Sequence, residues 1–116
     1  MNTQVKQLAD GTVGLVAIKG EIDFSVLPEM RQALDEANAS SPSCLLVDLT
    51  DVSFIASDGL GVLIEAHRKA DEGGQRFDLI HPQPHILGIL RKTQLTKLFQ
   101  VYENVDDAIA GERPSN

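Results

Sequence analysis

The residues best suited to chemistry lie in the stretch FIASDGLG, residues 54–61, where Ser57 and Asp58 separate an apolar run from a segment of helical periodicity. A serine at that junction predicts a helix N-cap, whose hydroxyl accepts a hydrogen bond from the backbone N–H of residue 59 or 60. The open N–H groups and the positive end of a helix also stabilise a phosphate on such a serine. Ser57 is therefore predicted to cap the helix, and it stands where a phosphate on its hydroxyl would be stabilised if the serine were modified.

Two glycines, Gly59 and Gly61, follow Ser57 at the start of the expected helix. Each lowers helix propensity by about 1 kcal/mol relative to alanine, so a purely structural helix start rarely contains two of them. Because glycine has no side chain, it lets a partner approach the backbone closely. The junction also follows the carboxyl end of a predicted strand, where open α/β sheets place their sites. These features favour a docking surface around Ser57.

Metal binding and nucleophilic catalysis find little support in the sequence. His81 and His85 have HxxxH spacing, but Pro82 and Pro84 break any helix that would place both imidazoles on one face. No Cys or acidic cluster completes a metal site there. Ser57 does not stand in a GxSxG motif, and the sequence puts no base beside it. We expect no catalytic residue, no metal and no cofactor, and a small hydrolase that uses Ser57 is the least favoured alternative.

The charge balance narrows the class of partner. The chain has 116 residues and a net charge of -7, so phosphate backbones and anionic lipid are poor electrostatic partners. The single cysteine, Cys44, lies in an apolar run, which predicts a buried small hydrophobe in a reducing compartment. No apolar run approaches the roughly 20 residues that span a bilayer, and the N-terminus lacks a signal-peptide pattern. We expect a cytoplasmic protein that binds neither nucleic acid nor membrane.

These residues must be positioned by alternating strands and helices. Asp10-Gly11 predicts a hairpin turn, Ser25 the N-cap of the first helix, Pro84 the start of a later one, and Asn104 the cap of the last. We expect strands near 5–8, 13–20, 44–55, 75–80 and 98–102, and helices over 25–40, 59–72, part of 81–95, and 104–111. The order predicts an α/β domain, with helices packed on a mixed, mostly parallel sheet of four to five strands and an N-terminal hairpin. One domain would span residues 1–110, and residues 111–116 would form a disordered tail.

Three segments together resemble the STAS domain of bacterial anti-sigma factor antagonists. The central one is LLVDLTDVSFIASDGLGVLIEAHRKADEGG, which is similar to an apolar strand followed by the family's D-S-S/T-G-L-G-V-L motif. Upstream, VAIKGEIDFSVLPEMRQAL resembles the G-E-L-D segment and first helix; downstream, LRKTQLTKLFQVYENVDDAIA resembles the end of the domain. The resemblance covers about residues 4–110 and implies a single STAS-like domain. The pairing of G-E-I-D with S-x-G-L-G at this separation is specific.

The resemblance implies a non-enzymatic partner-switching module. In that family an ATP-dependent anti-sigma serine kinase phosphorylates the motif serine, here Ser57. The unphosphorylated form binds the kinase and frees the sigma factor, and a metal-dependent serine phosphatase of the PP2C type restores it. Asp23 matches the acidic residue of the G-E-L-D loop, near the serine. The implied partner-binding residues are Asp23, Ala56, Ser57, Asp58, Gly59, Leu60 and Gly61.

The sequence departs from the family motif on both sides of the serine. Ala56 replaces the usual acidic residue before it, and Asp58 replaces the usual Ser or Thr after it. The local charge is kept while the geometry changes. A second hypothesis therefore stays open, in which the chain is a STAS scaffold without phosphorylation, or a regulatory subunit of a signalling or transport assembly.

Overall fold

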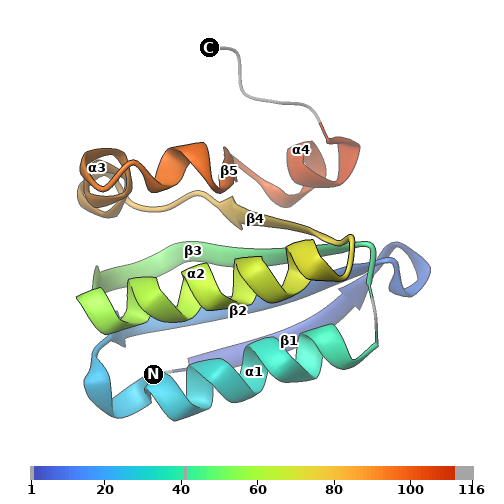
Figure 1. Cartoon of the computed structure of the whole chain (residues 1–116), viewed down its shortest axis with the longest axis horizontal. Helices are drawn as coiled ribbons and strands as arrows, with labels where there is room; N and C mark the ends of the chain where they lie inside the picture. The colour runs from blue at the N-terminus through green and yellow to red at the C-terminus, as the bar shows by residue number, and fades with distance from the viewer. Residues whose placement is uncertain (1, 41, 112–116) are drawn as a thin grey trace.

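The computed structural model describes residues 2–40 and 42–111, and its elements follow the predicted order of strands and helices (Figure 1). Gly111, with a φ of 70°, ends the last helix, and the rest of the predicted tail, residues 112–116, lies outside the described residues. In the described ranges no helix combines the length and apolar content that crossing a membrane requires. The elements are β1 (Asn2–Leu8), β2 (Val13–Ile22), α1 (Leu27–Ala39), β3 (Cys44–Ile55), α2 (Ser57–Glu72), β4 (Arg76–Ile80), α3 (Pro84–Lys92), β5 (Gln100–Tyr102) and α4 (Val105–Ala110), with 3-10 turns at Ala9–Gly11, Phe24–Val26 and Leu95–Lys97.

Within the described residues the strands form one sheet in the order β1-β2-β3-β4-β5. β1 and β2 pair antiparallel, whereas the other neighbours pair parallel. This confirms the prediction of a mixed, mostly parallel sheet with an N-terminal hairpin. Four residues, Ala9–Thr12, separate the paired Leu8 and Val13, so the turn is two residues longer than the Asp10-Gly11 pair alone, and its first three residues have positive φ.

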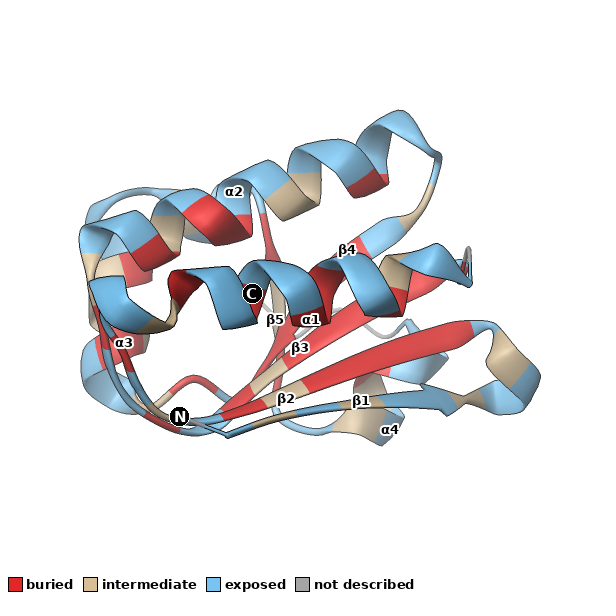
Figure 2. Ribbon diagram, turned by 90° about the horizontal axis from the view of Figure 1, so that it is seen from below, coloured by how far each residue is buried: buried red, intermediate tan, exposed pale blue. Residues whose placement is uncertain are grey.

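Helices cover the two faces of the sheet unequally (Figure 2). α1 and α2 lie over one face, where together with α3 they form the large hydrophobic core. Met30, Leu34 and Leu63 are buried there, as their helical spacing predicts. α4 lies on the other face, over a smaller apolar cluster that includes Cys44 and Tyr102. The prediction of an α/β domain with helices packed on its sheet is confirmed.

The middle of the sheet is buried on both faces, as the unbroken apolar run Cys44–Val47 predicts. Cys44 is a free and buried thiol. Burial raises the pKa of that thiol to about 11, against the opposing effect of the Arg76 guanidinium. Because the thiol stays protonated at neutral pH, Cys44 acts as the small hydrophobe that the sequence predicts and not as a nucleophile.

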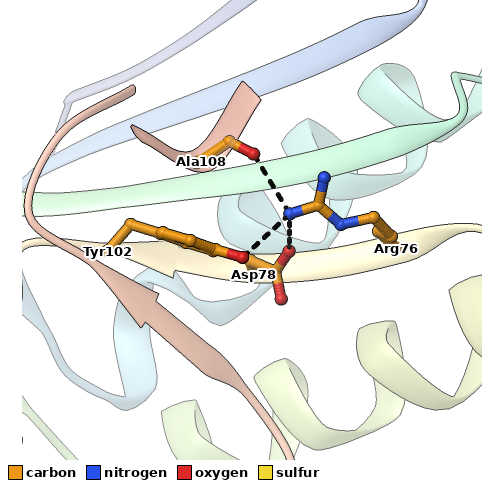
Figure 3. Close-up of polar contacts among 4 residues, drawn as sticks. All are labelled: Arg76, Asp78, Tyr102 and Ala108. Carbon is orange, nitrogen blue, oxygen red and sulfur yellow. Dashed lines mark hydrogen bonds and ion pairs between the residues drawn. The ribbon is translucent and has the colours of Figure 1, made fainter. Parts of the chain in front are cut away.

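A polar network, the Arg76 network, fastens α4 to the sheet (Figure 3). Nη2 of Arg76 donates to Asp78 Oδ2 at 2.7 Å, to the Tyr102 hydroxyl at 3.2 Å and to the Ala108 carbonyl at 3.1 Å. Asp78 is only 4% exposed, the one charged residue buried among those described. The guanidinium compensates the buried negative charge of Asp78, and its hydrogen bond to the Ala108 carbonyl holds α4 against the sheet. The Arg76 network is therefore a structural feature, at the end of the sheet remote from the start of α2 (Figure 1).

Candidate docking site

The site begins where β2 and β3 leave the sheet. Ile22 and Ile55 are parallel partners at the carboxyl ends of these strands, and the Ala56 N–H donates to the Ile22 carbonyl at 2.9 Å. The second half of β3 pairs with β2 alone, because β4 is shorter and its last partner on β3 is Asp48. Asp23 and Ser57 therefore follow the two strands at the same end of the sheet, as the resemblance implies for these two positions.

Ser57 is the first residue of α2 and is exposed. The N-cap position belongs to Ala56, which has extended φ and ψ of -78° and 161° and offers no side-chain cap. Its carbonyl accepts from the N–H groups of Gly59 at 2.9 Å and Leu60 at 3.2 Å. The prediction that Ser57 caps the helix is therefore wrong, because the helix starts one or two residues earlier than the sequence indicates. Among the described residues no hydrogen bond engages the Ser57 hydroxyl.

Asp23 organises the loop that faces the helix start. Its Oδ1 accepts from the Ser25 hydroxyl at 2.6 Å and from the Ser25 N–H at 3.0 Å, so Asp23 caps the 3-10 turn Phe24–Val26. The Ser25 hydroxyl, followed by the Ser25 N–H, lowers the pKa of Asp23 below its ordinary value. Val26 holds the N-cap position of α1, so the prediction that Ser25 caps this helix is also wrong. Asp23 is thus an ionised group whose hydrogen bonds fix its own loop.

The two glycines of the motif have different environments. Gly59 is buried, and a Cβ there would lie 2.7 Å from Cγ2 of Ile22 and 3.0 Å from Cγ1 of Ile55. The lack of a side chain at Gly59 therefore lets α2 pack closely on the strand ends. Gly61 is exposed, and a Cβ there would meet nothing within 4 Å. This corrects the expectation that both glycines keep the surface bare, which holds only for Gly61.

A groove of about 580 Å³, the Ser57 groove, lies between the start of α2 and the segment that joins β2 to α1. Ser57 and Asp58 line it from one side, and Phe24 lines it from the other with 76% of its surface exposed. Leu60 packs against the hydrophobic core and does not line the groove. The full lining is Phe24, Ser25, Leu27, Pro28, Arg31, Ser57, Asp58, Gly61, Val62 and Glu65.

Sequence reasoning missed most of the α1 side of the Ser57 groove. Phe24 follows Asp23 directly and stands outside the helical pattern that Leu27 and Met30 begin. A large apolar residue left out of a core pattern, beside a predicted site, is the signal that could have identified it. Arg31 lies on the outer face of α1 and carries no comparable signal, because its position relative to Ser57 depends on how α1 and α2 pack.

His67 and His85 make packing and hydrogen-bonding contacts within the fold. His67 packs edge-on against Phe77 and Phe99, with ring centroids 6.0 and 5.5 Å apart. His85 Nε2 lies 2.7 Å from the Ser53 carbonyl oxygen. In the part of the chain that the structure describes, no three His, Cys, Asp or Glu side chains are grouped to hold a metal ion.

Known proteins resemble this chain along almost all of its length. The STAS domain family model matches residues 4–108. The anti-sigma-F factor antagonist RsfB of Mycobacterium tuberculosis is 28% identical over 106 residues, which cover 87% of this chain and 82% of that protein. An anti-sigma factor antagonist from Mycobacterium paratuberculosis is 31% identical and superposes with a TM-score of 0.84 over 95% of this chain and 92% of that one. The anti-sigma factor antagonist SpoIIAA in its unphosphorylated form, 16% identical, shares the fold with a TM-score of 0.78 over 97% and 100% of the two chains.

The matched region contains both halves of the Ser57 groove. Asp23 and its 3-10 turn come from the G-E-I-D segment, and Ser57 comes from the S-x-G-L-G segment. The sheet order, the helix placement and these two segments agree with the similarity along the chain. The protein belongs to the STAS domain family and, within it, to the anti-sigma factor antagonists.

Proposed function

We propose that this protein is an anti-sigma factor antagonist that acts by partner switching. The unphosphorylated form binds an ATP-dependent anti-sigma serine kinase through the Ser57 groove and so frees a sigma factor. Phosphorylation of Ser57 abolishes this binding, and a metal-dependent serine phosphatase of the PP2C type reverses it. The observation that carries the proposal is the exposed Ser57 hydroxyl at the first position of α2, inside a groove.

The position of Ser57 suits an acceptor of a phosphoryl group. Phosphoryl transfer needs an attacking oxygen in line with the leaving oxygen of the nucleotide, and little covalent chemistry from the protein. The Ser57 hydroxyl is exposed and has no hydrogen-bond partner among the described residues, so a kinase can reach it without breaking a contact. The product phosphate would stand at the positive end of a 16-residue helix, which stabilises an anion.

The same position explains how a phosphate would release the partner. A phosphoserine carries about -1.5 to -2 charges at neutral pH. Asp58 is adjacent and already negative, and the remaining phosphates of the kinase-bound nucleotide must face Ser57 for transfer to occur. Like charges would then meet at the centre of a closed contact. The switch acts by local repulsion, without refolding, because core packing holds the helix start through Gly59.

The names of relatives support the role. RsfB of Mycobacterium tuberculosis and the Mycobacterium paratuberculosis protein are both named anti-sigma factor antagonists, and each is similar to this chain over most of its length. Both names give an anti-sigma factor as the protein that is antagonised. Kinase binding and phosphorylation are our extension for this chain.

A second function is favoured by one observation. Asp58 puts an exposed carboxylate in the first turn of α2, next to Ser57. If that charge substitutes for a phosphate, the chain is a constitutive STAS scaffold or a regulatory subunit of a signalling or transport assembly. Ser57→Glu then leaves the binding of its partner unchanged, whereas the switching mechanism predicts a loss of at least about 100-fold for several like charges in a closed contact.

The decisive experiment is a phosphorylation assay with each purified anti-sigma kinase of the source organism and ATP, read by intact-protein mass spectrometry. We expect one kinase to add a single phosphate to the wild-type chain and none to Ser57→Ala. Ser53→Ala is the matched control, since Ser53 is also exposed and lies four residues earlier, and it should gain one phosphate like the wild type. The proposal is contradicted if Ser57→Ala gains a phosphate. It is also contradicted if none of the kinases phosphorylates the wild-type chain.

A further inference from the structure

Phe24 is the most exposed large hydrophobic side chain in the part of the chain that the structure describes. It is 76% exposed, against 46% for Phe54 and 40% for Ile109. A phenylalanine in water forgoes the free energy that its burial would bring, so contact with a partner at this position would recover that free energy. The side chain lies on the rim of the Ser57 groove, opposite Ser57 and Asp58.

The backbone beneath Phe24 is held in place. Phe24 is the first residue of the 3-10 turn that Asp23 caps, through bonds of 2.6 Å and 3.0 Å to the Ser25 hydroxyl and N–H. The turn is closed by a bond from the Val26 N–H to the Asp23 carbonyl at 3.2 Å. An exposed aromatic side chain on an ordered turn loses little conformational freedom on binding, and that is how aromatic anchors of protein interfaces gain affinity.

We infer that Phe24 is the anchor by which this protein docks on its kinase, entering an apolar pocket of the kinase surface beside the nucleotide. The inference rests on the proposed function, because it names the residue that holds the kinase to the groove in which Ser57 is phosphorylated. Phe24 and Ser57 line opposite sides of one groove. A protein that brings ATP to the Ser57 hydroxyl therefore covers the Phe24 side chain as well.

The charged side chains around Phe24 predict which charges surround the apolar pocket on the kinase. Asp23 precedes Phe24 in the chain, Asp58 lies across the groove, and Arg31 is the basic side chain in the groove lining. The balance is negative, so the complementary kinase surface carries basic groups around an apolar centre. This arrangement separates two roles. Phe24 supplies affinity, while Ser57 faces the phosphates of the nucleotide and supplies the switch.

The test uses the full chain and the kinase that phosphorylates Ser57 in the assay above. Steady-state phosphorylation is measured for the wild type, Phe24→Ala, Phe24→Tyr and Ile109→Ala. Ile109 is the matched control, an exposed apolar residue on α4, which lies far from the 3-10 turn in both views of the molecule (Figures 1 and 2). Thermal melting of each variant checks the fold, which an exposed side chain should leave unchanged.

We expect Phe24→Ala to raise KM roughly 30-fold or more, the size of an aromatic hot spot, with kcat within about twofold of the wild type. Phe24→Tyr should keep most of the affinity, and Ile109→Ala should behave as the wild type. A KM within about twofold for Phe24→Ala, or an equal loss for Ile109→Ala, overturns the anchor while the proposed function stands. If no kinase phosphorylates the wild type, the proposed function fails and the anchor fails with it, and the wild-type arm alone reveals this.

Discussion

The Ser57 groove and the Arg76 network use polar side chains in opposite ways. In the Arg76 network one guanidinium binds a buried carboxylate, a hydroxyl and a backbone carbonyl, so almost every polar group has a partner. In the Ser57 groove the Ser57 hydroxyl and the Asp58 carboxylate are exposed, beside an aromatic ring in water. The difference shows that satisfied polar groups in this fold hold an element in place, whereas unsatisfied ones at the strand ends are available to a partner.

The largest effect on stability is expected in the Arg76 network. Arg76→Ala leaves the Asp78 carboxylate buried without its counter-charge, so we expect a loss of about 3 kcal/mol in the free energy of unfolding, measured by urea denaturation. The exposed Lys69, which lies 3.8 Å from Glu65, is the control. Lys69→Ala should cost no more than about 0.5 kcal/mol. Equal losses for the two variants would show that the Arg76 network is an ordinary surface pair.

Gly59 and Gly61 allow a packed position and a surface position to be compared within one helix. Gly59→Ala forces a Cβ against Ile22 and Ile55, and overpacking of this kind costs about 1–3 kcal/mol of stability. Gly61→Ala meets no atom, so it should stabilise the chain by about 0.5–1 kcal/mol through helix propensity. Urea denaturation of both variants should therefore give changes of opposite sign.

Gly61→Ala should weaken kinase binding although it stabilises the fold. If the kinase approaches the bare backbone at Gly61, the stabilised Gly61→Ala variant should bind roughly 10-fold more weakly, about 1.4 kcal/mol, in a titration with the Ser57 kinase. A variant that is both more stable and equally well bound would remove Gly61 from the docking surface.

The sequence predicted the order of the elements well, because that order depends on local periodicity and on turn residues. The apolar run Cys44–Val47 and the helical spacing of Met30 and Leu34 each indicate burial without knowledge of any neighbour. The family resemblance predicts a docking site at Asp23 and Ser57, which stays a prediction; the parallel pairing of β2 and β3 brings the two positions to one end of the sheet.

The helix starts were predicted less well, for a physical reason. Ser25 and Ser57 were both expected to cap a helix, and each lies one residue from the true N-cap position, Val26 and Ala56. A cap contributes about 1 kcal/mol, which strand pairing readily outweighs. The bond from the Ala56 N–H to the Ile22 carbonyl fixes where the chain leaves the sheet, and the helix starts from there.

The residues that were missed depend on tertiary contacts. Arg76 and Asp78 follow the alternation of an ordinary half-exposed strand, and only the fold brings Tyr102 and the Ala108 carbonyl to them. Arg31 likewise joins the Ser57 groove only through the packing of α1 beside α2. Such partners lie too far away along the chain for a local pattern to reveal.

The smallest expected effect tests whether the Asp23 loop is fixed before binding. The bonds from Ser25 lower the pKa of Asp23 below its ordinary value of 3.8, so their contribution to stability is present above that pH and is lost as the pH falls through the lower, folded value. In Ser25→Ala the hydroxyl bond is gone. An NMR titration of the Asp23 carboxyl should then show the pKa moving back toward 3.8, while stability at pH 7 changes little because the loop is exposed. The affinity for the kinase should fall by only about threefold, roughly the cost of ordering one exposed turn, because Phe24 itself is intact. If Ser25→Ala instead binds as weakly as Phe24→Ala, the order of the turn and not the aromatic ring supplies the affinity.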